Sequence, residues 1–225
     1  MPKNEIDGYP DGFRIRSRQE QVETLLSHFS NLDPNHIEEL AKGNLPESAE
    51  GWAVIPSPGK IAPTYFEALK KILEHIPEIS GYWNWREELV KNQQHLELVW
   101  KTKKTHDFLM AKQPGDFWVF PFQFGKNWPW VLTPFCEVKR TMRFADNEFG
   151  FGPYELAILM LTHPDRITGP YQQYVYSAGC EHKNKAGFNF SFGFSWSYGY
   201  EKQTLQYGMS NRVEEWGDVT GFLSP

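Results

Sequence analysis

The chain has 225 residues, a net charge of −5 at pH 7 and an aromatic content of 16%. The balance of apolar and charged residues excludes a disordered chain, and the acidic net charge argues against a protein built for non-specific nucleic-acid binding. Two cysteines cannot form a disulfide framework, so we expect a cytoplasmic, reducing environment, with no signal peptide and no membrane-spanning helix.

Two short helices are predicted in the first fifty residues. Ser17 precedes Glu20 by three positions, which is the spacing of a capping box, and apolar residues then recur at helical intervals. The pair Asp33-Pro34 predicts an N-cap followed by proline at the first helical position, with Ile37 facing the core. We expect Gly43 to end this second helix.

Further along the chain, apolar runs bounded by proline and glycine alternate with amphipathic segments. Pro121 lies within one of these runs, and because proline cannot donate to a β-ladder, we expect that strand to end as an edge strand. Residues 156–161 are all apolar, which predicts a helix in the centre of the fold. The predicted strands span 52–55 and 117–124, and the predicted helices span 64–76, 86–112 (broken once), 133–145 and 153–161.

The clearest predicted element is an aromatic strand at 188–200. Every second residue of this stretch is aromatic and every residue between is small, so the rings lie on one face of the strand. Such a face is typical of a core wall, and the alternative is a stacking platform for sugars or bases. We expect a bend near Gly193. Its neighbours are a predicted strand at 171–176, a polar turn at 180–187 and a partner strand at 204–209.

Two Trp-x-Trp loops are the main candidate for a binding surface. Alternation in an extended loop places both rings of each pair on the same side. Loops lie on the surface and tryptophan is enriched at binding hot spots; the alternative is that both loops fold back over the core. The candidate residues, including a basic residue beside each loop, are Trp83, Trp85, Arg86, Lys126, Trp128 and Trp130.

Two basic segments extend this candidate surface. One lies within the predicted 86–112 helix and the other on the later turns of the predicted 133–145 helix. A solvated helix face is the ordinary explanation for such a segment, and an acidic or phosphate-bearing partner is the alternative. The residues concerned are Lys101, Lys103, Lys104, Lys139, Arg140 and Arg143.

No motif in the sequence defines a catalytic chemistry. Glu155 stands where a dinucleotide loop at residues 150–152 would have its third glycine, and its charge would oppose a pyrophosphate. Metal-ligand spacings do not occur, so we predict no metal and no cofactor. The fold would have to assemble a hydrolase site, from Cys136 or Cys180 with a distant histidine or from two carboxylates. The carboxylates available for such a pair are Glu87, Glu137, Asp146 and Glu148.

These patterns predict an α+β fold, in which N-terminal helices and the 153–161 helix pack on an antiparallel or mixed sheet centred on the strand at 188–200. We expect one domain over 1–225, with a helical subdomain at 1–47 and an α+β body at 51–225 as the alternative division. The function predicted first is that of a non-enzymatic binding protein, whose Trp loops and basic segments contact a protein partner. A hydrolase and a nucleic-acid-binding accessory protein are the alternatives.

Overall fold

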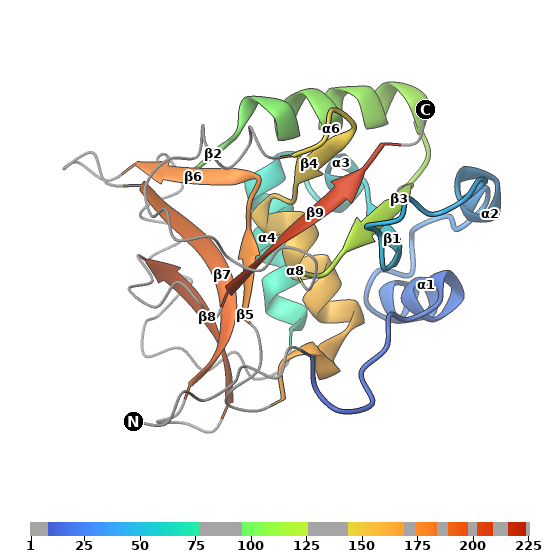
Figure 1. The fold of residues 1–225 in the computed structure, drawn as a ribbon. Helices are drawn as coiled ribbons and strands as arrows, with labels where there is room; N and C mark the ends of the chain where they lie inside the picture. The colour runs from blue at the N-terminus through green and yellow to red at the C-terminus, as the bar shows by residue number, and fades with distance from the viewer. Residues whose placement is uncertain are drawn as a thin grey trace.

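Helices and a large sheet make up the described part of the chain, and the α+β prediction is confirmed (Figure 1). In this computed structural model the described residues are 9–76, 96–125, 144–168, 174–183, 189–197, 202–208 and 216–223. The strands are β1 (Gly51–Pro56), β2 (Leu96–Leu98), β3 (Phe117–Gln123), β4 (Glu148–Gly150), β5 (Tyr174–Ser177), β6 (Cys180–Lys183), β7 (Asn189–Ser197), β8 (Lys202–Gly208) and β9 (Trp216–Phe222). The helices are α1 (Arg18–His28), α2 (Ile37–Leu40), α3 (Pro58–Ile61), α4 (Tyr65–His75), α6 (Trp100–Lys112) and α8 (Pro153–Thr162), and the 3₁₀ helix η2 spans Pro164–Arg166.

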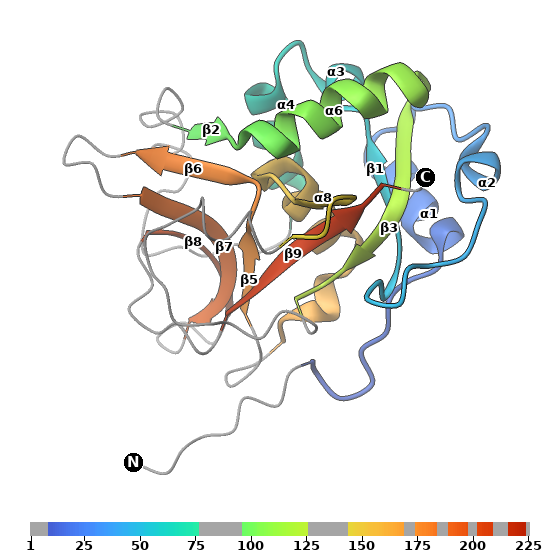
Figure 2. The same cartoon turned by 45° about the horizontal axis from the view of Figure 1, so that its top comes forward.

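Within the described residues the strands form one mixed sheet with its last strand in the middle. The order is β1-β3-β9-β5-β7-β6-β2, with β4 beside β9 and β8 beside β7. Figure 2 shows β9, in red, between the green β3 and the orange β5. The pairing of β5 with β9 is parallel, and the remaining described pairings are antiparallel. The C-terminal segment therefore joins the two halves of the sheet, a role that its own sequence did not predict.

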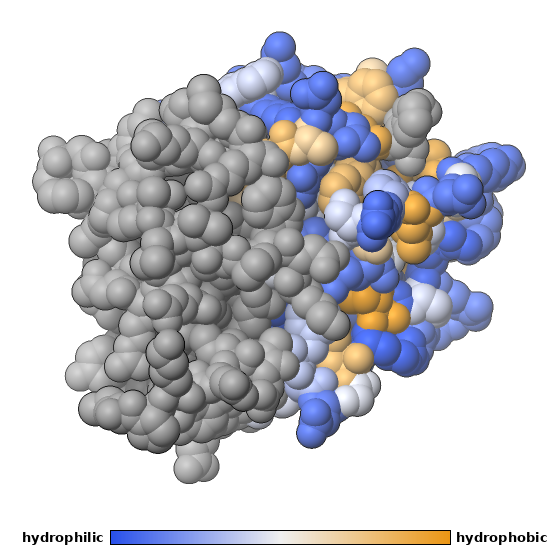
Figure 3. All heavy atoms as spheres, in the orientation of Figure 1, coloured by the Kyte–Doolittle hydropathy of each residue, from blue (hydrophilic) through white to orange (hydrophobic). Residues whose placement is uncertain are grey.

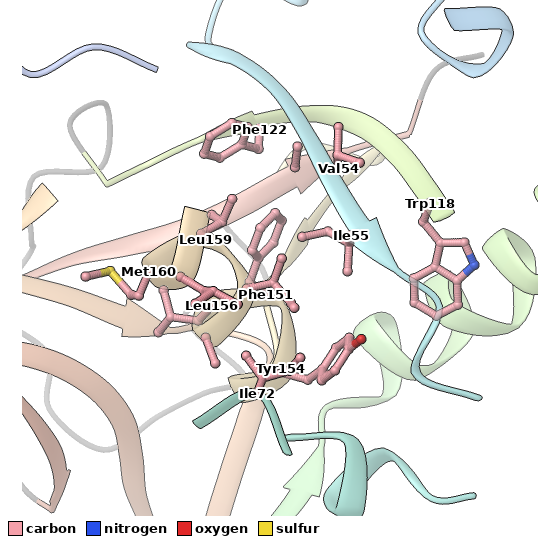
Figure 4. Close-up of a cluster of buried hydrophobic side chains, with 14 of the residues drawn as sticks. Val54, Ile55, Ile72, Trp118, Phe122, Phe151, Tyr154, Leu156, Leu159 and Met160 are labelled. Carbon is pink, nitrogen blue, oxygen red and sulfur yellow. The ribbon is translucent and has the colours of Figure 1, made fainter. Parts of the chain in front are cut away.

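The helix α8 lies in the centre of the fold, as its apolar sequence predicts. Each of its residues is buried, and it packs against α4, α1 and the sheet. Figure 4 shows Leu156 and Leu159 of α8 beside Phe151, with Val54 and Ile55 of β1 to their right. Burial of such a helix on all sides is the expected result of an apolar surface with no polar stripe.

An aromatic cluster forms the wall between α8 and the sheet. The ring of Phe120 meets those of Phe149 and Phe151 edge-on, at centroid distances of 5.3 and 5.5 Å. Phe122 and Phe151 are stacked at 6.2 Å. Edge-to-face and offset-stacked contacts are the favoured geometries of aromatic pairs. The predicted strand at 188–200 is present as β7, between β8 on one side and β5 and β6 on the other.

Two predicted helices begin at capping residues, and the first of these caps was itself predicted. Ser17 and Glu20 form the predicted capping box at the start of α1, and the Thr64 side chain accepts the backbone N–H of Glu67 to cap α4. The second predicted helix is shorter than its proline signal suggested. The Asp33 carboxylate accepts the backbone N–H of Asn35 at 3.0 Å, which forms a turn, so α2 begins at residue 37.

Several segments predicted as helix or turn are strands. Residues 96–98, placed in the 86–112 helix, form β2 and pair with β6. The predicted polar turn at 180–187 contains β6. Residues 148–150 form β4, and residues 58–61 form the short helix α3. The strand β3 does not end as an edge strand. It pairs with β9 from Phe122 onward, one residue beyond Pro121, so the proline's missing N–H removes no bond to β9.

Two glutamine side chains form hydrogen bonds with backbone groups of β1 and β3 that a neighbouring strand would otherwise pair. The Gln21 amide donates to the Trp52 carbonyl at 2.8 Å and accepts the Val54 N–H at 3.0 Å. The Gln113 amide donates to the Val119 carbonyl at 3.0 Å and accepts the N–H of the same residue at 2.7 Å. Both amides therefore satisfy the backbone of β1 and β3 in the manner of a ladder.

Buried polar side chains near the end of α8 hold the segment that precedes α1. The Arg166 guanidinium is fully buried and lies 4.3 Å from the ring centroid of Tyr9, a cation–π contact. The Nε2 atom of His163 accepts the backbone N–H of Arg16 at 3.0 Å. Burial lowers the pKa of His163 to about 4, so this imidazole is neutral at pH 7, as its role as an acceptor requires.

Candidate interaction surface

The helix α6 carries most of the exposed large apolar side chains of the described residues. Trp100, Phe108 and Met110 are 64%, 41% and 52% exposed, and Leu45 at 40% is the remaining member of this group. Trp100 and Phe108 are two turns apart with Lys104 between them, so the three share a face. Figure 1 places α6 along the upper edge of the molecule, where Figure 3 shows hydrophobic residues among hydrophilic ones. We call this face, defined by Trp100, Lys103, Lys104, Phe108 and Met110, the α6 surface.

The opposite face of α6 is buried although most of its residues are polar. The buried residues are Thr102, Thr105, His106 and Leu109. The Thr102 hydroxyl donates to the Gly150 carbonyl at 2.8 Å, and Nε2 of His106 lies 3.1 Å from Oε1 of Glu155. An amphipathic helix normally buries its apolar stripe. Polar contacts therefore set the orientation of α6, and its largest apolar side chains remain in solvent.

Three of the predicted binding residues lie on α6, and the structure separates their roles. Lys101 donates to the Ala145 carbonyl at 2.8 Å, and burial lowers its pKa. The Lys104 ammonium lies 4.9 Å from the ring centroid of Trp100, which is a cation–π distance. Within the described residues the Lys103 side chain makes no hydrogen bond or ion pair. Lys103 and Lys104 thus present their charges outward, whereas Lys101 supports the fold.

The beginning of α6 concentrates positive charge. Its N-cap, Val99, makes no side-chain capping bond, and its first turn has no acidic residue. Lys101 and Lys103 lie instead in this first part of the helix. Because the N-terminal end of a helix dipole is itself positive, these lysines raise the potential there. An anionic group from a partner would be attracted to this end of the α6 surface.

Beneath α6, a buried carboxylate belongs to the start of α8. Glu155 is 1% exposed, and its Oε2 accepts the Tyr65 hydroxyl proton at 3.0 Å. The same hydroxyl accepts the backbone N–H of Tyr154 at 3.0 Å. Tyr65 from α4 therefore caps α8 where the N-cap residue, Gly152, has no side chain. A Cβ at Gly152 would overlap the Tyr65 hydroxyl and the Glu155 carboxylate, so this cap requires glycine.

The contact between His106 and Glu155 is the buried histidine–carboxylate pair of the described residues, and neither residue was a predicted catalytic candidate. Its two atoms are 3.1 Å apart without the alignment of a hydrogen bond. The Tyr65 cap and the helix dipole supply a structural role for the Glu155 charge. Burial and this charge together raise the pKa of Tyr65 well above 10, so its hydroxyl stays protonated and can donate.

The other catalytic candidates that the structure describes do not form a site. Cys180 is buried rather than in a polar turn, and its sulfur accepts the Ser177 hydroxyl at 3.2 Å. Glu148 accepts the Thr220 hydroxyl at 2.5 Å, within the sheet, and Asp146 is exposed. Cys136, Glu87 and Glu137 lie outside the described residues.

The Trp-x-Trp loops and the second basic segment also lie outside the described residues, so their role stays a prediction. This holds for Trp83, Trp85, Arg86, Lys126, Trp128, Trp130, Lys139, Arg140 and Arg143. On α6 itself, Met110 is exposed and His106 is buried, an arrangement that the sequence analysis did not predict. Plotting residues 100–112 on a helical wheel would have shown the polar face opposite Trp100.

Comparison with protein-family models, with curated proteins and with solved structures found no match for this chain. Within the described residues there is no group of three or more histidine, cysteine, aspartate or glutamate side chains that could hold a metal ion. No helix in the same part of the chain combines the length and apolar character that a membrane crossing requires. The fold and the α6 surface therefore carry the functional argument.

Proposed function

We propose that the protein is a non-enzymatic binding protein whose α6 surface contacts an acidic segment of a protein partner. The observation that carries this proposal is the inverted burial of α6, with Trp100, Phe108 and Met110 exposed above a polar buried face. Exposed apolar residues that are scattered singly need no explanation, but a group on one helix is typical of an interaction site.

The composition of the α6 surface favours a protein segment that has both acidic and apolar side chains. Trp100 is the natural anchor because tryptophan leads the residue types found at binding hot spots. Lys104 already lies over its ring, so less side-chain entropy is lost when a carboxylate binds there. The first turn of α6 has no acidic residue, so the positive end of the helix gives the partner's carboxylates a further favourable interaction.

The hydrolase alternative has one geometric support, the pair His106 and Glu155. Both residues are buried, and Glu155 accepts a hydrogen bond from Tyr65, which caps α8. These structural contacts account for the pair without an external substrate. The nucleic-acid alternative requires a second basic segment on the same face as α6. That segment lies outside the described residues, so the nucleic-acid alternative stays a prediction. The mixed apolar and basic character of the α6 surface is what supports a protein partner.

The test compares wild type with variants of the α6 surface. A partner captured from native lysate and then purified should bind Trp100→Ala about thirtyfold more weakly than wild type, which is the effect of losing about 2 kcal/mol at a hot spot. The double charge reversal Lys103→Glu/Lys104→Glu should also weaken binding, and higher salt should weaken wild-type binding. Circular dichroism would confirm that each variant is folded.

The exposed lysine Lys42, outside α6, provides a matched control. Lys42→Ala should bind the partner as wild type does. Equal affinity of wild type and Trp100→Ala would contradict the proposal. Binding that nuclease treatment abolishes would identify a nucleic acid instead, and binding to anionic vesicles without any protein partner would identify a membrane surface.

A further inference from the structure

The C-terminal ends of α1 and α4 bring two histidines together, away from the α6 surface. His28 is in the last turn of α1 and His75 is in the last turn of α4. Their ring centroids are 4.9 Å apart and the rings are inclined by 52°. Neither imidazole makes a hydrogen bond or an ion pair within the described residues. His28 is exposed and His75 is half-buried, so solvent reaches the pair.

We propose that His28 and His75 form a binding site for one divalent transition-metal ion. Neutral imidazole is a preferred ligand of Zn²⁺, Ni²⁺ and Cu²⁺. With a metal–nitrogen bond of about 2.1 Å, the ion would lie about 3.2 Å from each ring centroid. For an ion bound by one nitrogen of each ring, centroids 4.9 Å apart correspond to an angle of about 100° at the metal, which lies between the angles of tetragonal and tetrahedral coordination.

The electrostatic setting favours a cation at this place. Both histidines lie at helix C-termini, where the exposed carbonyl groups form the negative end of the helix dipole. The lysine one turn before His75 is Lys71, and its ammonium donates to the Ile61 carbonyl at 2.8 Å. Phe29 packs edge-on against His75 at 4.9 Å and restricts the orientation of this ring. Water molecules would complete the coordination of the ion.

Metal binding at this site can be tested directly, because each histidine ligand can be removed separately. Untagged protein should bind one Cu²⁺ or Ni²⁺ ion, and the ion should raise the midpoint of thermal unfolding because it binds the folded chain. His28→Gln and His75→Gln should each weaken binding by about tenfold or more and abolish the rise in midpoint. The electron paramagnetic resonance spectrum of the Cu²⁺ complex should show two coupled nitrogens in wild type and one in each variant.

His36 is the matched control, because it is an exposed histidine at the N-cap of α2, away from His28 and His75, and pairs with Glu39. His36→Gln should bind Cu²⁺ as wild type does. Equal binding of Cu²⁺ by wild type, His28→Gln and His75→Gln would overturn the proposal, as would an unchanged midpoint in wild type. Because His28 is exposed, its variant folds independently of any packing lost at His75, and it alone can decide the test.

Discussion

The helices α8 and α6 lie on opposite sides of the buried contact between Glu155 and His106, and they follow different rules of burial. Each residue of α8 is buried, and most of its side chains are apolar. In contrast, α6 buries a face of two threonines, a histidine and a leucine, and leaves a tryptophan, a phenylalanine and a methionine in solvent. The position of α8 follows from the hydrophobic effect, which has no direction.

The position of α6 depends on polar contacts, chiefly the hydrogen bond of Thr102 with Gly150 and the 3.1 Å approach of His106 to Glu155. Such contacts contribute modestly to net stability, but they fix which face of the helix points outward. This difference indicates that the exposure of apolar side chains on α6 follows from the orientation of the helix. The apolar surface is held outward by polar residues on the other face, which is the arrangement that an interaction surface needs.

The largest expected effect on stability comes from a substitution in the buried helix α8. Leu159 is fully buried in α8, and Leu159→Ala should lower the free energy of unfolding by about 3–5 kcal/mol through lost burial and a cavity. Urea denaturation at pH 7 measures this. Met110→Ala on α6 is the matched control and should change the free energy by less than about 0.5 kcal/mol. Similar losses for both variants would remove the distinction between the two helices.

Acidification should lower the free energy of unfolding through His163, which lies at the end of α8. Its pKa is lowered from 6.5 to about 4 in the folded protein, so between these values the unfolded chain binds the extra proton and stability falls as the pH falls. The loss from this residue should reach about 2–3 kcal/mol between pH 7.5 and pH 4.5. Urea unfolding of wild type and His163→Gln across this range measures it.

Since carboxylates also titrate in acid, the informative quantity is the difference in pH dependence between wild type and His163→Gln. The variant should lose less stability than wild type on acidification. Parallel curves for the two proteins would show that His163 is accessible to protons in the folded state and that its bond to the Arg16 backbone is not maintained.

The cap that joins α4 to α8 should have an intermediate effect. Tyr65→Phe keeps the ring and removes the hydroxyl that serves both Tyr154 and Glu155. Loss of an N-cap costs about 1–2 kcal/mol, which chemical denaturation would detect. Tyr9→Phe is a useful contrast, because it removes a hydroxyl that donates to Glu50 at 2.6 Å outside α8. A negligible effect of Tyr65→Phe would show that water replaces the hydroxyl.

The smallest expected effect on stability belongs to Trp100. Because its side chain is 64% exposed, Trp100→Ala should change the free energy of unfolding by less than about 0.5 kcal/mol, although it removes the largest side chain of the α6 surface. Thermal and chemical unfolding of the variant would measure this. A loss above about 1 kcal/mol would mean that Trp100 packs on the fold and would weaken the case for an interaction surface.

Sequence patterns predicted the elements whose signals are local. Ser17 and Glu20 located α1, and the unbroken apolar run at 156–161 located α8 and its burial. The misplaced elements are those that depend on distant partners. Residues 96–98 fit a helical stripe, but their pairing with β6 makes them a strand. The strand β9 has a weak local pattern, and its pairing partners come from three separate segments of the chain.

The candidate surface was predicted in part for the same reason. The lysines of α6 were visible as a basic cluster, but the side that faces outward is decided by Glu155 and Gly150, which no local pattern connects to α6. Trp100 and Phe108 were therefore not recognised as exposed. The roles of Lys101 and Lys104 also differ through tertiary contacts, with the Ala145 carbonyl in one case and the Trp100 ring in the other.

The two glutamine amides on β1 and β3 have a consequence for behaviour in a crowded solution. An open strand edge is a template to which a strand of another molecule can add, and repeated addition leads to aggregation. Gln21 and Gln113 satisfy the outward N–H and C=O groups at Trp52, Val54 and Val119 but are side chains, so they present no further backbone edge. At these positions the backbone therefore offers no free N–H or C=O group to which a strand of another molecule could add.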